Sequence, residues 1–373
     1  MSHPTPQTYR ATAAVAFPQI ADYADAFIES IATHDMTIHC RNGVCEIASA
    51  FGRARFAPRA GGFDLYVEAD DPGALNRLKH ALVGPIGFIA AREALDIVWQ
   101  GDHADPALPD DLRVLTVEMI EDLTPRMRRI TFRGEDLHRY DRDDQLHCRL
   151  IFQPRGTIEP RWPMLDHRGH VVWPDDKAVP TRVYTIRQID ATAGTLVVDF
   201  ALHADPGPAT RFAMEARKGD MAGVLGPAAH APKPAAFYVL IGDETALPGI
   251  ARIMENLPDI AVGHAFIEVD GSADQLPLHC PANIELRWLF REGRPAGTTS
   301  LLPDAVRTVA WPSDLQRTFL WGGCEHAAFS AIHRHLRHKI DLPRDRFILY
   351  SHWHRTMSEE EIIKKGAEAY LPG

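Results

Sequence analysis

Hydrophobic and polar residues follow three different patterns along the chain, and these patterns divide it into three blocks. In the first block, apolar residues recur at helical spacing from Pro18 to Thr33 and again from Pro72 to Ala90. Residues 1–105 are therefore predicted to form a small α+β domain. Its predicted strands are the short runs Thr37–Cys40, Val44–Ala48, Ala54–Ala57, Phe63–Ala69 and Leu95–Trp99.

The stretch from Gly101 to Asp111 is rich in aspartate and contains prolines, which is typical of a linker. The second block, residues 112–232, is rich in strands and contains one long proline-rich loop, Gln153–Pro180. The even spacing of its strands predicts an antiparallel β-barrel. The predicted strands are Leu112–Ile120, Met127–Phe132, Leu146–Phe152, Arg182–Ile189, Thr195–Phe200 and Met221–Leu225.

Strands and helices alternate in the third block, residues 235–373, and a short helix is expected within Met357–Gly373. This rhythm predicts a parallel sheet with a nucleotide crevice at the carboxyl ends of its strands. The whole chain is thus expected to be a multi-domain α+β and α/β protein. The predicted strands are Phe237–Ile241, Val262–Val269, Ile284–Phe290, Thr318–Trp321 and Phe347–Tyr350, and the predicted helices are Thr245–Leu257 and Glu325–Ile340.

Composition and net charge restrict the class of protein further. The 373 residues are 45% hydrophobic and 24% charged, as in ordinary globular proteins. The net charge of −10 argues against general nucleic-acid binding, which needs a basic surface. The sequence shows no leader-like start and no apolar run long enough to cross a bilayer. We expect a cytoplasmic protein that does not insert into membranes, and a monomer.

The five cysteines are sparse, and an odd number without a leader sequence indicates reduced thiols. Cys40 and Cys45 flank Asn42-Gly43, a strong hairpin signal, so their side chains can face each other. A metal-binding pair there is an alternative, but no second Cys/His pair at zinc spacing follows. No metal site is predicted.

The segment Arg182-Val-Tyr-Thr-Ile-Arg187 combines residue types that suit a flavin. On a strand, Arg182 and Tyr184 point to one face, and Thr185 and Arg187 to the other. An arginine fork suits a pyrophosphate, a flat aromatic ring suits the isoalloxazine, and a hydroxyl suits the N5 edge. An ordinary edge strand with exposed arginines explains the same residues equally well.

A second segment begins at His203, where a predicted strand ends, and opens a helix. Gly207, Ala209 and Thr210 supply backbone N–H groups at that helix start, which favours an anion such as a phosphate. A plain loop with a capped helix is the alternative. The turn Gly226-Pro227 closes the second block.

Together these segments resemble the siderophore-interacting FAD-binding reductases, a branch of the ferredoxin-reductase-like flavoproteins. The family pattern is Arg-x-Tyr-Thr-x-Arg, a strand ending in His-Gly, then Gly-Pro-Ala-Ser-x-Trp-Ala and Gly-Pro. The chain follows this order and departs from it at Ala204, Thr210 and Phe212. The resemblance covers residues 112–356. It implies FAD held by Arg182, Tyr184, Thr185, Arg187, His203, Gly207, Ala209 and Thr210.

Two loops of the third block resemble the family's nicotinamide-nucleotide site. One follows the strand ending at Ile241, and the other follows the strand ending at Trp321. No G-x-G-x-x-G sequence is present, so the choice between NADH and NADPH stays open. Cys324 replaces a usual glycine and is either a neighbour of the nicotinamide or a small buried thiol. The implied NAD(P)H-binding residues are Gly242, Asp243, Glu244, Thr245, Gly323, Cys324 and Glu325.

The end of the third block is locally basic and rich in histidine. Trp353 matches the family's Gly-Tyr-Trp motif, whereas Ser351 and His352 depart from it. The histidines from His333 to His338 fit a solvated helix face. We expect an electropositive rim that attracts an anionic ferric siderophore or the phosphate of NADPH. The predicted substrate residues are His352, Trp353, His354 and Arg355.

The expected activity is hydride transfer from NADPH or NADH to FAD without a catalytic acid or base. Electrons then pass singly to a ferric siderophore, and Fe(II) is released in the cytoplasm. A general flavin or quinone reductase is one alternative. A non-enzymatic ferric-siderophore or haem carrier is another. The first block resembles a small domain of unknown function found ahead of such reductases, and its role stays open.

Overall fold

The computed structural model describes residues 8–32, 36–90, 93, 95–102, 105–174, 178–203, 206–357 and 361. The chain forms two compact units. One contains Met1–Leu112 and Glu159–Val179, and the other contains Arg113–Ile158 and Pro180–Gly373. Most of the proline-rich loop in the second block therefore groups with the N-terminal unit. Almost all of the helix expected within Met357–Gly373 lies outside the described residues.

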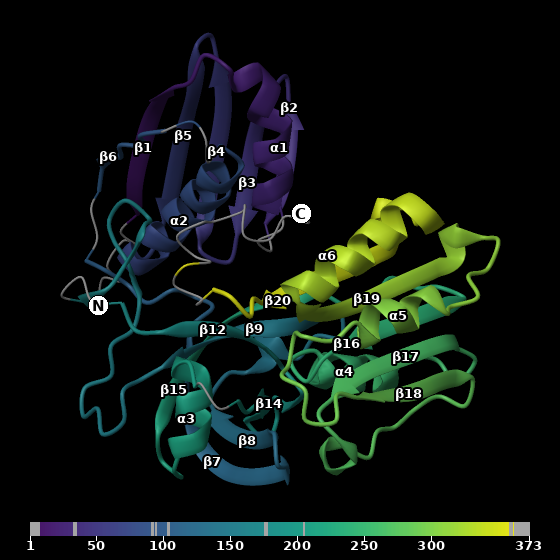
Figure 1. The fold of residues 1–373 in the computed structure, drawn as a ribbon. Coiled ribbons are helices and arrows are strands. Elements are labelled where there is room, and N and C mark those ends of the chain that lie inside the picture. The colour runs from purple at the N-terminus through teal and green to yellow at the C-terminus, as the bar shows by residue number, and fades with distance from the viewer. Residues whose placement is uncertain are drawn as a thin grey trace. The chain divides into compact units, whose positions relative to one another are not determined.

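The N-terminal unit is a six-stranded antiparallel sheet in the order β2-β3-β4-β5-β1-β6. Two helices, α1 (Ile20–Ala32) and α2 (Pro72–Ile89), cover one face of it (Figure 1). This confirms the predicted α+β character. The strands are β1 (Tyr9–Ala16), β2 (Thr37–Arg41), β3 (Val44–Ser49), β4 (Gly52–Arg59), β5 (Gly62–Ala69) and β6 (Gln100–Gly101).

One strand of this unit was missed, and one predicted strand is wrong. β1 was missed because its buried positions are mainly alanines, Ala11 and Ala13, which give a weak hydrophobic alternation. The strand predicted at Leu95–Trp99 is not a strand; the chain pairs with β1 only at Gln100–Gly101. Trp99 is buried in the core there and gave the misleading signal.

Cys40 and Cys45 pair directly across the β2–β3 hairpin, as predicted. They are joined in a disulfide with a Cα–Cα distance of 4.0 Å. The expectation that all five thiols are reduced is therefore wrong for this pair, and a metal-binding pair is excluded there. Cys148, Cys280 and Cys324 are free thiols.

The inserted segment, Glu159–Val179, is held by three side chains that contact consecutive backbone carbonyls, two of them from α2 and the third from Trp99. Lys79 Nζ donates to the carbonyl of His167 at 3.1 Å, and Trp99 Nε1 donates to that of Arg168 at 3.2 Å. His80 Nδ1 lies 2.7 Å from the carbonyl of Gly169. Lys79 is fully buried and also donates to the carbonyl of Asp102.

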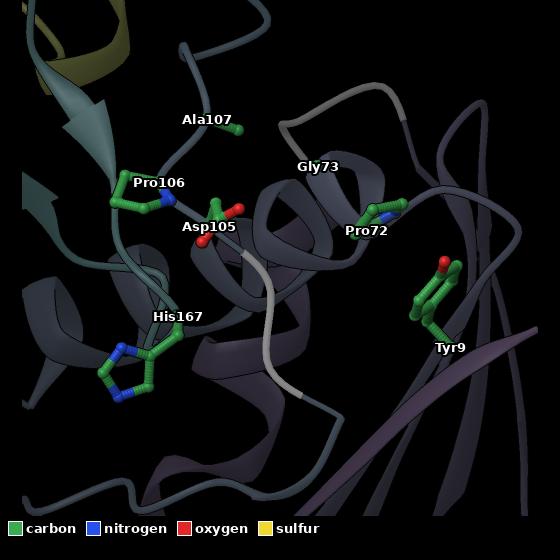
Figure 2. A pocket seen from close by; sticks show the side chains of 7 residues that line it. All are labelled: Tyr9, Pro72, Gly73, Asp105, Pro106, Ala107 and His167. Carbon is green, nitrogen blue, oxygen red and sulfur yellow. The ribbon is translucent and has the colours of Figure 1, made fainter.

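The inserted segment contains a short hairpin, β10 (Met164–Leu165) and β11 (Val171–Val172). Its Leu165 exchanges two backbone hydrogen bonds with Ala107, at 2.7 and 3.0 Å. The surface of this unit is hollowed nearby, and Figure 2 shows the residues that line the hollow: Tyr9, Pro72, Gly73, Asp105, Pro106, Ala107 and His167.

In the second unit, seven antiparallel strands are paired in the order β12-β9-β15-β7-β8-β14-β13. β12 and β13 stand at the two ends of this order, yet they are consecutive in the chain. The sheet therefore closes on itself, which confirms the predicted barrel. The strands are β7 (Arg113–Thr124), β8 (Met127–Gly134), β9 (Gln145–Phe152), β12 (Thr181–Thr185), β13 (Gln188–Asp190), β14 (Thr195–Ala201) and β15 (Met221–His230).

The α/β part of this unit is a five-stranded parallel sheet in the order β18-β17-β16-β19-β20. Helix α4 (Leu247–Asn256) lies on one face, and α5 (Leu301–Arg307) and α6 (His326–His335) lie on the other (Figure 1). α5 was not predicted. The strands are β16 (Phe237–Gly242), β17 (Val262–Val269), β18 (Ile284–Phe290), β19 (Thr318–Glu325) and β20 (Phe347–Trp353).

Candidate functional site

The proposed flavin strand is β12, which pairs with β9 so that Tyr184 lies opposite Cys148 and Thr185 lies opposite His147. The Tyr184 ring packs against Phe200, with 4.6 Å between ring centroids. This contact holds the aromatic ring in a fixed place on the barrel wall. Thr185 is buried, and Arg182 is half-buried.

Arg187 lies just past β12, and its side chain is bound by other residues of the protein. Its guanidinium donates two hydrogen bonds to Glu255 of α4, at 2.5 and 2.7 Å, and lies 3.9 Å from Asp199. Only 7% of Arg187 is exposed. Unlike Arg182, it joins the barrel to the α/β sheet, so we leave it out of the residues proposed to bind FAD.

Helix α3 (Pro208–Glu215) begins after Gly207, with Pro208 in the first turn. The N-cap residue Gly207 has no side chain, and within the described residues no side-chain cap is formed here, so an anion can be accepted by the first-turn N–H groups. Thr210 Oγ1 lies 2.9 Å from His203 Nε2, which brings these two predicted residues together. Phe212, where the family has tryptophan, packs on Phe152 with 5.1 Å between ring centroids.

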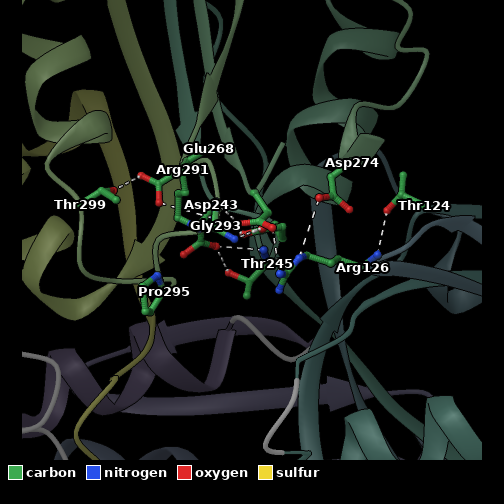
Figure 3. A network of polar contacts seen from close by, with 12 residues as sticks. Thr124, Arg126, Asp243, Thr245, Glu268, Asp274, Arg291, Gly293, Pro295 and Thr299 are labelled. Carbon is green, nitrogen blue, oxygen red and sulfur yellow. Dashed lines mark hydrogen bonds and ion pairs between the residues drawn. The ribbon is translucent and has the colours of Figure 1, made fainter. Parts of the chain in front are cut away.

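Asp243 connects three segments at the carboxyl ends of the parallel strands, and Figure 3 shows it beside Thr245. Its Oδ1 accepts from the backbone N–H of Thr245 at 2.9 Å and from the Thr245 hydroxyl at 2.6 Å. Its Oδ2 accepts from the N–H of Glu325 at 3.1 Å and from Trp353 Nε1 at 2.9 Å. Burial raises the pKa of Asp243, and these four hydrogen bonds oppose the rise.

The Asp243 contacts determine the tautomer of His352. The Thr245 hydroxyl donates to Asp243, so it can only accept from His352 Nδ1, which lies 2.9 Å away. Burial lowers the pKa of His352 to about 4, so the ring is neutral near pH 7. The proton therefore sits on Nδ1, and Nε2 carries a lone pair.

His352 packs flat on Gly323, where an added Cβ would lie 2.3 Å from the imidazole. A Cβ on Gly322 would lie 2.2 Å from the carbonyl oxygen of Ile241. The two glycines after Trp321 thus allow close packing within the protein. No local sequence pattern reports this contact between Gly323 and His352.

His147 of the barrel and His352 of the sheet lie beside each other, with 6.2 Å between ring centroids. Tyr350 lies 5.6 Å from His147 on the same measure. Burial lowers the pKa of His147 to about 3, with smaller contributions from His352 and Arg252. Neither His147 nor Arg252 was among the predicted site residues. Both were missed because their partners are distant in the sequence.

Glu244 forms a buried ion pair with Arg291 from the loop after β18, with contacts of 2.5 and 2.9 Å. Glu268 lies 3.6 Å from the same guanidinium and accepts from the Thr299 hydroxyl at 3.0 Å (Figure 3). Burial raises the pKa of both carboxyl groups. Glu244 thus holds the loop in place rather than facing solvent.

Cys324 lies at the end of β19 and is 1% exposed. Burial raises the pKa of its thiol well above the ordinary value, and the neighbouring Asp243, Glu325 and Glu268 add to the rise. It borders a small cavity shared with Asp243, Glu268 and Glu325. Cys324 is therefore a neutral thiol, which agrees with the alternative of a small buried residue.

The predicted rim residues differ in exposure: Trp353 and His354 contact other parts of the protein, whereas Arg355 is exposed. Trp353 is bound to Asp243, and Glu325 Oε1 accepts from the backbone N–H of Arg355 at 3.0 Å. His354 is buried and stacks on His326, with 4.1 Å between ring centroids. Arg355 is exposed, so of these side chains it is the one freely presented to solvent.

Comparison with known proteins agrees with this arrangement. A model of the siderophore-interacting FAD-binding domain matches residues 116–231, and a model of the siderophore-interacting protein matches residues 235–356. The crystal structure of the siderophore-interacting protein SipS from Aeromonas hydrophila is 32% identical, with a TM-score of 0.59. It covers 68% of this chain and 96% of SipS. The chain belongs to the siderophore-interacting protein family.

Two curated relatives of this family member are named as reductases. Ferric vibriobactin reductase ViuB of Vibrio cholerae is 29% identical over 64% of this chain and 88% of its own length. The NADPH-dependent ferric-chelate reductase of Escherichia coli is 32% identical over 48% of this chain and 72% of its own length. These similarities support a siderophore-related flavin reductase with FAD as cofactor. Within the described residues, no helix is long and apolar enough to cross a membrane.

Proposed function

We propose that this protein is an FAD-dependent oxidoreductase that takes electrons from NADH or NADPH and reduces ferric siderophores, releasing Fe(II) in the cytoplasm. One observation carries the proposal. The barrel strand proposed to bind FAD and the loops proposed to bind the nucleotide meet, since His147, opposite Thr185, lies beside His352, which contacts Thr245. Two cofactors bound to these elements would be held close together.

FAD would be held by Arg182, Tyr184 and Thr185 on β12 and by the uncapped start of α3 at Gly207, Ala209 and Thr210, with His203 beside it. Bound there, FAD supplies the conversion between a two-electron nicotinamide donor and a one-electron ferric acceptor. The fit rests on the fixed Tyr184 ring and on the free N–H groups of α3. No side chain of the site is required as an acid or base.

The nucleotide would be held by the loops after β16 and β19, which carry the predicted residues Gly242, Asp243, Glu244, Thr245, Gly323, Cys324 and Glu325. Glu244 and Cys324 are buried and would act by shaping these loops. Asp243 keeps these loops together, and the His352 ring covers Gly323. The ferric siderophore would approach on the side of His352, Trp353, His354 and Arg355, where Arg355 offers an exposed positive charge.

The test is an anaerobic stopped-flow experiment on the FAD-loaded protein. A nicotinamide nucleotide should bleach the flavin absorbance, and a ferric siderophore should then restore it together with Fe(II) trapping. Restoration by quinones or dioxygen alone would instead indicate a general flavin reductase. A protein that binds no FAD would contradict both enzymatic functions.

A further inference from the structure

The end of β17 is the place where a nucleotide-binding sheet distinguishes the two nicotinamide nucleotides. In open α/β sheets, the nucleotide lies across the carboxyl ends of the strands. An acidic residue near the end of the second strand suits a free ribose 2′-hydroxyl, whereas an arginine suits a 2′-phosphate. Here β16, α4 and β17 form that unit, and the residue directly after β17 is Asp270.

Asp270 and a second carboxylate, Asp274, share one arginine. Arg126, from the turn between β7 and β8, lies 2.9 Å from Asp270 and 3.9 Å from Asp274 (Figure 3 shows its contact with Asp274). Asp270 also accepts from the backbone N–H of Gly293 at 3.2 Å. Two negative charges are thus opposed by one positive charge.

Asp274 has an oxygen that the protein leaves unsatisfied. Its side chain is 7% exposed, and within the described residues its Oδ1 is buried without a hydrogen-bond partner. A buried carboxylate oxygen without a donor is costly, so it favours a ligand that brings a donor. A ribose hydroxyl is such a donor, whereas a phosphate dianion is not.

The other charged groups at this edge of the sheet do not cancel the excess of negative charge at Asp270 and Asp274. Arg291 is fully buried between Glu244 and Glu268, so it is not available to a phosphate. Arg294 is exposed, and its Nε donates to the carbonyl of Arg291. The neighbouring Glu292 is also exposed and adds a further negative charge.

We infer that the nucleotide site selects NADH over NADPH, and that Asp270 is the residue that disfavours a 2′-phosphate. This inference rests on the proposed function, because it assumes that the loops after β16 and β17 bind a nicotinamide nucleotide. It identifies the electron donor, which the sequence leaves open.

Calorimetric binding of NAD⁺ and NADP⁺ to the FAD-loaded, full-length protein tests this without turnover. NAD⁺ should bind about tenfold more tightly or better, because a phosphate dianion is repelled by the uncompensated carboxylates. Added salt should reduce the difference, since it screens that repulsion. In Asp270→Asn, the preference should shrink several-fold, mainly through tighter NADP⁺ binding.

Asp64→Asn is the matched control, because Asp64 also pairs with an arginine, Arg59, at 2.9 Å but lies in the N-terminal unit. It should leave the preference unchanged. Wild-type protein that binds NADP⁺ as tightly as NAD⁺ would overturn the inference and leave the proposed function intact. The same conclusion would follow if a folded, FAD-loaded Asp270→Asn kept the full preference. Binding of neither nucleotide would overturn the proposed function itself.

Discussion

At the scale of single residues, burial controls the chemistry of the titratable groups near the site. The predicted partners of the nucleotide include Cys324, Asp243 and Glu244, and burial favours the neutral form of each of these three. The two histidines at the junction of barrel and sheet are neutral for the same reason. These buried, neutral groups differ from the exposed ionised groups typical of acid–base catalysis, which fits the proposal that the junction holds cofactors in place.

The three free thiols should differ in reactivity towards iodoacetamide. Burial raises the pKa of Cys148 to about 12 and that of Cys324 well above its ordinary value, and both are buried. Cys280 is partly exposed, so although burial raises its pKa too, it should be alkylated first. Mass spectrometry of tryptic peptides measures the order. All three should react together in urea, and rapid native labelling of Cys324 would contradict its assignment as an inert thiol.

His147 should make the protein less stable in acid. Its folded pKa of about 3 lies below the ordinary value of 6.5, so the unfolded chain takes up a proton that the folded chain refuses. Stability from this group is present above pH 6.5 and is lost as the pH falls towards 3. Through this group, the free energy of unfolding changes by at most about 1.4 kcal/mol per pH unit.

Urea unfolding of His147→Gln at several pH values across that window measures this contribution. The variant should show a shallower loss of stability with acidification than the wild type. The exposed His138 provides the control, and His138→Gln should keep the wild-type slope. Equal slopes in all three proteins would mean that His147 is not the group responsible.

At the scale of elements, the carboxyl ends of the parallel strands and the inserted segment are the two places where distant parts of the chain are held together. The first is organised by Asp243, and the second by α2. Gly169 shows how tight the second contact is: its φ is +81°, and an added Cβ would lie 2.5 Å from the backbone nitrogen of His80. Only glycine allows the segment to approach the helix so closely.

Replacing Lys79 by methionine should release the inserted segment. The substitution fills the same buried space but removes the donor to the carbonyls of Asp102 and His167. Leaving these carbonyls without that donor costs about 1–3 kcal/mol. Trypsin should then cleave faster after the exposed Arg168. Lys218→Met, at an exposed position, is the control; an unchanged cleavage rate in Lys79→Met would show that the lysine does not hold the segment.

The elements also show what the sequence could and could not predict. β17 and β18 have the predicted bounds, because each is rich in β-branched and aromatic residues and lies between turn-forming segments. β1 was missed because alanines fill its buried positions, and α5 because it has only seven residues.

The motifs of the candidate site were found from the local spacing of residues in the sequence. The contacts of Arg187 with Glu255 and of Thr245 with His352 join residues 68 and 107 positions apart, and no local pattern reports them.

At the scale of the whole molecule, the residues matched by the family models fall almost entirely within one of the two compact units. The segments matched by the family models begin at residue 116 and end at residue 356, and apart from the insertion Glu159–Val179 they belong to the second unit. The N-terminal unit has its own core, which includes Phe27, Phe56 and Phe63. A unit with its own core can unfold separately from the rest. FAD binding should then depend on the second unit alone.

The disulfide offers a way to test this independence. Cys45 is buried in the core of the N-terminal unit, and its bond to Cys40 closes a short loop, so losing it should cost about 2 kcal/mol or less. Calorimetry of Cys40→Ser/Cys45→Ser should show one unfolding transition at lower temperature and a second one unchanged, with unaltered FAD affinity. Cys280→Ser, in the second unit, should affect only the other transition. A single transition that shifts as a whole, together with weaker FAD binding, would mean that the N-terminal unit supports the flavin site directly.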